Sequence, residues 1–148
     1  MEDILELKTR LDNCMKKSYR PKYLHPKTIN NFIFHFNSLR YKEKEFTFLH
    51  LNNYLHEVEE MHTITRNESA DLFTAYLLPV AKIYDRDLGF TPMINIFLII
   101  LWFIAIGILL ILLNLPTIVF YLLALLLLTY YAYAVFKKMQ KKVYGLMF

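Results

Sequence analysis

The pattern of apolar and polar residues divides the chain into two parts. Residues 88–136 form a run of forty-nine residues without one Asp, Glu, Lys, Arg or His, interrupted only at residues 114–116, Asn-Leu-Pro. On either side of this interruption, residues 93–113 and 117–136 rise about 1.5 Å per residue as helices, enough to cross a hydrocarbon core of about 30 Å. The pattern therefore predicts a two-helix antiparallel transmembrane hairpin with its turn at residues 114–116.

The residues before this run show helical spacing. In residues 2–17, apolar side chains recur every three or four positions, which predicts an amphipathic helix. Pro21 and Pro26 then predict a connector, after which Thr28 is the expected cap of a second helix. Further helices are predicted for residues 46–62 and from residue 65 to about residue 88. The apolar stripe of the second helix comprises Ile29, Phe32, Ile33, Phe36 and Leu39.

Residues 29–51 also fit a different pattern. Phe32, Phe34 and Phe36 alternate with other residues, as do Phe46 and Phe48 after a charged segment, and alternation of this kind is typical of a β-hairpin. No Gly, Asn-Gly or Asp-Gly turn signal separates the two halves, which favours the helix. Both interpretations stay open at this point.

Local signals predict how the last helix before the hairpin begins and ends. Thr65 and Glu68 have the spacing of a capping box, in which each side chain binds a free backbone amide of the other residue. Pro79 should kink or divide the helix, and Gly89 suits its carboxyl-terminal cap. Thr91-Pro92 is expected to start the first span. The fold class predicted is all-α: an N-terminal cytosolic helical domain (1–90), the transmembrane hairpin (91–136) and a short basic juxtamembrane tail (137–148).

Charge adds a prediction of orientation. All thirteen acidic residues and thirteen of the seventeen Lys and Arg residues precede Leu88, so the first part is neutral and the net charge of +4 belongs to the tail. Lysines at a membrane edge bind anionic lipid headgroups at about 1 kcal/mol each, which is a simpler role than binding nucleic acid. Because basic flanks stay in the cytoplasm, we expect a multi-pass membrane protein with both termini cytosolic. The headgroup lysines are Lys137, Lys138, Lys141 and Lys142.

The sequence predicts no enzyme and no cofactor. Glu59 and His62 form a Glu-x-x-His pair near His56, which is a weak metal-site candidate, but no second such motif supplies the other ligands. The favoured interpretation is that the side chains of His56, Glu59 and His62 are exposed to solvent or cap a helix. Cys14, the single cysteine, lies on an apolar helical face, and the three glycines form no phosphate-binding loop.

Small and polar residues inside the hairpin predict packing. Counting outward from the turn places Gly107 at the depth of Leu123 and Ala124, where small side chains let helices approach closely. The second span also carries a stripe of smaller and more polar residues that favours contact with protein over lipid. The residues predicted to pack the hairpin or to line a pore are Asn95, Ala105, Gly107, Thr117, Tyr121, Ala124, Thr129 and Tyr131.

Three functions are compatible with this layout. The first is a homo-oligomeric protein that forms a pore or perturbs the membrane, with cytosolic helices that receive a signal or a protein partner. The second is a non-catalytic membrane anchor or assembly subunit of a larger complex. A holin-like lysis protein is the third, and ninety residues of helical domain are more than such a protein needs.

Overall fold

The computed structural model of the chain describes residues 2–18, 20–61, 63–92, 101, 103–108 and 117–145. The chain divides into two compact units. The folded unit combines Met1–Pro92 with Lys141–Phe148, and the apolar unit is Met93–Gln140. Residues 141–148 therefore belong to the same unit as residues 1–92, whereas the sequence analysis treated residues 137–148 as a separate tail.

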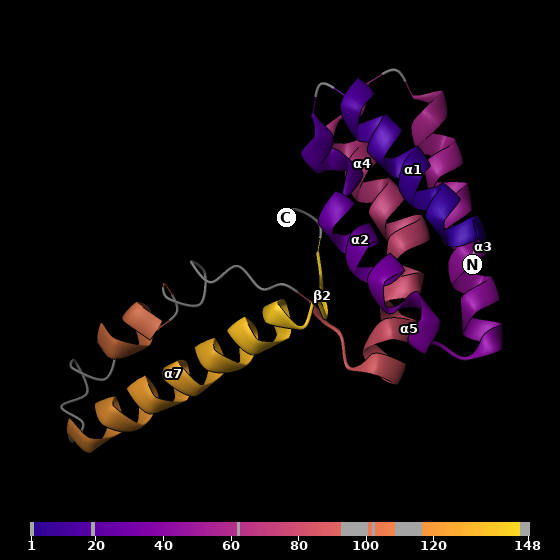
Figure 1. Cartoon of the computed structure of the whole chain (residues 1–148). Helices are drawn as coiled ribbons and strands as arrows, with labels where there is room; N and C mark the ends of the chain where they lie inside the picture. Colours follow the sequence, from indigo (N-terminus) through magenta and orange to yellow (C-terminus); the bar gives the residue numbers. More distant parts are fainter. Residues whose placement is uncertain are drawn as a thin grey trace. The chain divides into compact units, whose positions relative to one another are not determined.

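The folded unit is built from helices (Figure 1), as the all-α prediction requires. Apart from Leu39 and Arg40, residues 29–51 lie in α2, η2 and α3, so the β-hairpin interpretation is wrong and the helical one is confirmed. The elements in chain order are α1 (Glu2–Lys17), η1 (Pro21–Leu24), α2 (Pro26–His35), η2 (Phe36–Ser38), α3 (Tyr41–Glu60), α4 (Arg66–Leu72), η3 (Phe73–Leu77), α5 (Leu78–Leu88), β1 (Thr91–Pro92) and β2 (Val143–Tyr144).

The core of the folded unit lies around α3, which packs against α1, η3 and α5. The helical stripes predicted from the sequence face this core, because burial of apolar side chains drives their association. Phe90, two residues after the end of α5, is also fully buried and ties the start of the apolar run to the core. The largest fully buried side chains include Tyr54, Tyr84, Phe32, Phe90, Leu7, Leu11, Leu24, Ile29, Leu51, Leu55 and Leu77.

Three local predictions are confirmed. The Thr65 hydroxyl accepts a hydrogen bond from the Glu68 amide, and the Thr65 amide donates to the Glu68 carboxylate at 2.8 Å, which completes the capping box. Pro79 lies in the first turn of α5, directly after the π-helical turn η3, because a proline cannot donate the helical hydrogen bond at its own position. Gly89 ends α5 in the left-handed region at φ 66°.

Two local predictions are wrong. Thr28 does not cap α2; the cap is His25, followed by Pro26, and Thr28 is a buried residue within the helix. Thr91-Pro92 does not begin a helix but forms the extended strand β1. Thr28 and Thr91 instead form hydrogen bonds with residues 142–145.

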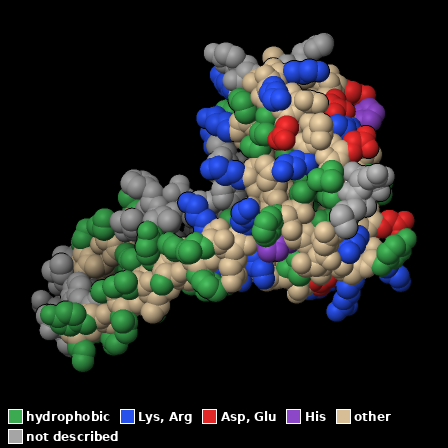
Figure 2. All heavy atoms as spheres, in the orientation of Figure 1, with side chains coloured by type: hydrophobic (Ala, Val, Ile, Leu, Met, Phe, Trp, Pro, Cys, Tyr) green, Lys and Arg blue, Asp and Glu red, His purple; other side chains and the backbone are tan. Residues whose placement is uncertain are grey.

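The apolar unit contains α7 (Thr117–Met139). Within α7, Tyr121–Met139 is long and apolar enough to cross a membrane, and this is the one such helix in the described part of the chain. The predicted first span, residues 93–113, is described only at 101 and 103–108, which are helical, and the predicted turn at 114–116 lies outside the described residues. Figure 2 shows hydrophobic side chains dominating the visible face of α7, whereas charged side chains are spread over that of the folded unit.

Candidate functional site

The first site is a clamp within the folded unit, where the segment that precedes the apolar unit pairs with the segment that follows it. β1 and β2 pair in parallel, with Thr91 opposite Val143 and Pro92 opposite Tyr144. The Thr91 amide donates to the Lys142 carbonyl oxygen at 3.0 Å. The chain thus leaves for the apolar unit and returns from it at neighbouring backbone positions of the folded unit.

Helix α2 supplies the side chains of this tail clamp. The Thr28 hydroxyl donates to the Gly145 carbonyl oxygen and accepts from the Gly145 amide, both at 3.2 Å. The Asn31 side-chain amide donates to the Val143 carbonyl oxygen at 2.8 Å. Val143 and Tyr144 are both buried, so apolar burial adds to the hydrogen bonds. Burial and the nearby Asp85 carboxylate together raise the pKa of Tyr144.

An aromatic cluster supports the clamp from the core side. The ring of Phe32 lies 4.7 Å from that of Tyr84 and 5.8 Å from that of Phe90. The buried Tyr84 hydroxyl donates to the Phe32 carbonyl oxygen at 2.8 Å, and burial raises the pKa of Tyr84. These contacts fix α2 against α5 and so fix the surface on which residues 143–145 lie.

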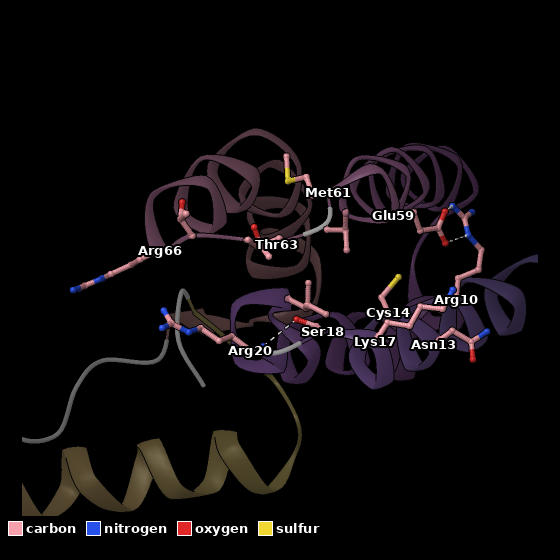
Figure 3. Close-up of a pocket in the computed structure, with 14 residues that line it drawn as sticks. Arg10, Asn13, Cys14, Lys17, Ser18, Arg20, Glu59, Met61, Thr63 and Arg66 are labelled. Atoms are coloured by element: carbon pink, nitrogen blue, oxygen red, sulfur yellow. Dashed lines mark hydrogen bonds and ion pairs between the residues drawn. The ribbon is translucent and has the colours of Figure 1, made fainter.

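The second site is a basic cleft in the folded unit, with a volume of about 680 Å³ (Figure 3). One wall is the carboxyl-terminal half of α1 with the residues that lead to η1, and the other is the end of α3 with the connection to α4. Its cationic side chains are Arg10, Lys17, Arg20 and Arg66, and its apolar lining is Leu24, Val58, Met61 and Ile64.

Arg10 links the two walls of the cleft, and its guanidinium is held by protein acceptors. Its guanidinium donates to both carboxylate oxygens of Glu59, at 2.9 and 2.7 Å, and to the Asn52 side-chain oxygen at 2.6 Å. The hydrogen bonds from Arg10 lower the pKa of Glu59, and the same contact raises the pKa of Arg10. Glu59 is thus an ionised partner of Arg10.

Cys14 lines the same cleft and is partly buried. Burial is the main cause that raises the pKa of its thiol, with a smaller contribution from the Glu59 carboxylate. A raised pKa keeps the thiol protonated and slows its reaction as a nucleophile. The nearby Arg10 and Lys17 act in the opposite direction, but they do not outweigh burial, so the pKa of Cys14 stays raised.

The residues of the weak metal candidate do not come together as ligands. Glu59 is bound by Arg10, and His56 lies 3.3 Å from the Glu60 carboxylate on the exposed side of α3. His62 lies outside the described residues. Within the described part of the chain, no three His, Cys, Asp or Glu side chains gather closely enough to hold a metal ion.

The predicted hairpin residues are only partly described. A Cβ added at Gly107 would meet no described atom within 4 Å, so the predicted close approach to Leu123 and Ala124 is not seen. Thr117 begins α7, and Thr129 donates to the Leu126 carbonyl oxygen at 2.9 Å. Asn95 lies outside the described residues. The exposed members of the set are Ala105, Tyr121, Ala124, Thr129 and Tyr131.

The four lysines expected at lipid headgroups fall into two pairs. Lys137 and Lys138 lie in the last turn of α7, where the Lys137 ammonium is 5.5 Å from the centre of the Tyr133 ring. Lys141 and Lys142 belong to the folded unit: the Lys141 ammonium is 4.2 Å above the Phe34 ring, and the Lys142 carbonyl accepts from Thr91. The sequence signal that could have shown this return is the apolar pair Val143-Tyr144 after the lysines.

Sequence analysis missed both sites for the same reason, which is that the residues that form each site are far apart along the chain.

No family model, curated protein or solved structure matches the chain.

Proposed function

We propose that the protein is an integral membrane protein whose apolar unit crosses the bilayer twice and self-associates, forming a pore or perturbing the membrane under control of the folded unit. In this proposal the folded unit and both termini lie in the cytosol. The single observation that carries the proposal is the tail clamp.

The clamp supports an even number of crossings. An odd number would place Thr91 and Lys142 on opposite faces of the membrane, separated by a hydrocarbon core of about 30 Å. That separation is incompatible with the 3.0 Å hydrogen bond between them. α7 accounts for one crossing, and the twenty-four uncharged residues 93–116 before it are long enough for the return.

Exposed tyrosines on α7 support self-association. Tyr121 and Tyr131 lie on one face of the helix with Ala124 between them, and their side chains are 77% and 51% exposed. Neither phenol hydroxyl forms a hydrogen bond with a described residue. Because an unpartnered hydroxyl is unfavourable in hydrocarbon, a second copy of the chain that accepts these hydroxyls lowers the free energy of the assembly.

The orientation is tested with single cysteines in a Cys14→Ser background. Ser38→Cys places a thiol on the exposed η2 of the folded unit, and Asn114→Cys places one in the predicted turn. A membrane-impermeant maleimide should label the first variant only from the cytosolic face of sealed vesicles and the second only from the opposite face. Labelling of both from one face would show that the chain does not cross the membrane and would overturn the proposal.

Self-association is tested by light scattering in detergent together with dye leakage from liposomes. The wild type should be a defined oligomer that releases dye, and Tyr131→Leu should weaken both properties. Leu126→Ile, on the opposite face of α7 and also exposed, is the matched control and should weaken neither. A monomer that releases no dye until a protein partner is added would replace this proposal with a membrane anchor.

A further inference from the structure

We propose that the basic cleft binds an organic phosphate, with the phosphate groups against Arg20 and Arg66 and the remainder of the ligand against the apolar lining. The binding is a property of the folded unit. It does not depend on how many times the apolar unit crosses the membrane or on its self-association.

The charge of the cleft is the first argument. Glu59 is the one carboxylate among the described residues that line it, and both of its oxygens already accept hydrogen bonds from Arg10. Lys17, Arg20 and Arg66 form no ion pair with any described carboxylate within 4.0 Å. Lys17 extends toward the Arg10–Glu59 end of the cleft (Figure 3), so the uncompensated pair at the other end is Arg20 and Arg66, and two such cations attract a multiply charged anion.

The placement of the two arginines is the second argument. Arg20 comes from the segment after α1, and Arg66 comes from the first turn of α4, so they approach from different walls. Figure 3 shows both side chains extending toward the same end of the cleft. Guanidinium groups bind phosphate oxygens through paired hydrogen bonds, and two of them on facing walls favour phosphate over a monovalent halide.

The size and lining of the cleft are the third argument. A volume of about 680 Å³ exceeds that of a bare phosphate and falls within the range of sites for nucleotide-sized ligands. Leu24 and Val58 form a buried apolar floor, and Met61 and Ile64 are partly exposed beside it. This floor suits the ring or chain of a phosphate ester.

Cys14 offers a direct measurement, because it is the only cysteine and it lines the cleft. The full chain in phosphatidylcholine nanodiscs is treated with a maleimide, and the alkylation rate of Cys14 is followed as ATP is added at constant ionic strength. ATP should slow alkylation in a saturable manner. Tripolyphosphate should slow it at higher concentrations only, and equal potency would contradict the assignment of the apolar lining to the ligand. Slowing by phosphatidylinositol 4-phosphate in the nanodisc, without ATP, would identify a lipid headgroup as the source of the phosphate.

Matched variants separate binding from a general charge effect. Arg66→Gln and Arg20→Gln each remove a charge-assisted contact and should raise the half-protecting concentration about tenfold. Lys82→Gln removes an exposed charge on α5 outside the cleft and should leave that concentration unchanged. The proposal is overturned if neither ATP nor the phosphoinositide protects Cys14, or if the double variant Arg20→Gln/Arg66→Gln is protected as well as the wild type.

Discussion

Thr28→Val tests the tail clamp with a change of almost no volume. The hydroxyl that is lost makes two hydrogen bonds to Gly145, and Thr28 itself is fully buried. Each hydrogen bond contributes roughly 1 kcal/mol net, and the Gly145 groups, which are only partly buried, regain bonds to water. We therefore expect the docking of residues 143–145 to weaken by about 1 kcal/mol, which is roughly a fivefold change in the population of the undocked form.

Hydrogen exchange measures this opening directly. In the full chain in nanodiscs, the amides of residues 143–145 should exchange about fivefold faster in Thr28→Val than in the wild type. Thr74→Val is the control, because it removes a hydroxyl that donates to the Ala70 carbonyl oxygen on an exposed helical surface far along the chain from the clamp. Unchanged exchange at Gly145 in Thr28→Val, or an equal increase in Thr74→Val, would refute the role given to Thr28.

Two further predictions concern the stability of the folded unit, measured by denaturant unfolding of the full chain in micelles. A double-mutant cycle of Arg10→Met and Glu59→Gln should give a coupling of about 0.5–1 kcal/mol at pH 7, because both side chains are partly exposed. Since the pKa of Glu59 is lowered in the folded state, the coupling is fully present above the ordinary carboxyl pKa of 4.5 and should be lost as the pH falls through the lowered pKa. A coupling that does not weaken in acid would contradict the ion pair. Tyr84→Phe should lower the free energy of unfolding by about 1–2 kcal/mol, because it removes the buried hydrogen bond to Phe32. Tyr54→Phe should leave the free energy of unfolding unchanged, since the buried Tyr54 hydroxyl has no hydrogen-bond partner among the described residues. Equal losses in the two tyrosine variants would show that these hydrogen-bond assignments do not determine stability.

Short-range patterns in the sequence predicted much of the folded unit. The helical stripes, the capping box at Thr65, the division at Pro79 and the cap at Gly89 each depend on residues within about one or two helical turns of one another. These interactions are local, so spacing along the chain is enough to identify them. The same locality explains why helical spacing identifies residues 29–51 as helical.

The two candidate sites were not predictable in this way. Thr28 and Gly145 are separated by 117 positions in the chain, and Arg10 and Glu59 by 49. Thr28 has the residue type of a helix cap, and nothing near it in the sequence indicates that its hydroxyl instead binds the returning tail. β2 is only two residues long, too short for an alternating pattern to identify a strand. Such contacts depend on the packed arrangement of α1, α2 and α3.

The parallel pairing of β1 with β2 also orders events during synthesis. β2 leaves the ribosome only after the whole of Met93–Gln140 has been made, which takes roughly 2–10 s at 5–20 residues per second. Until then Thr28 and Asn31 lack their partners, although the helices from α1 to α5 are already complete. The hydrogen bonds that α2 and β1 make with residues 142–145 can therefore form only after residues 93–140 have been translated.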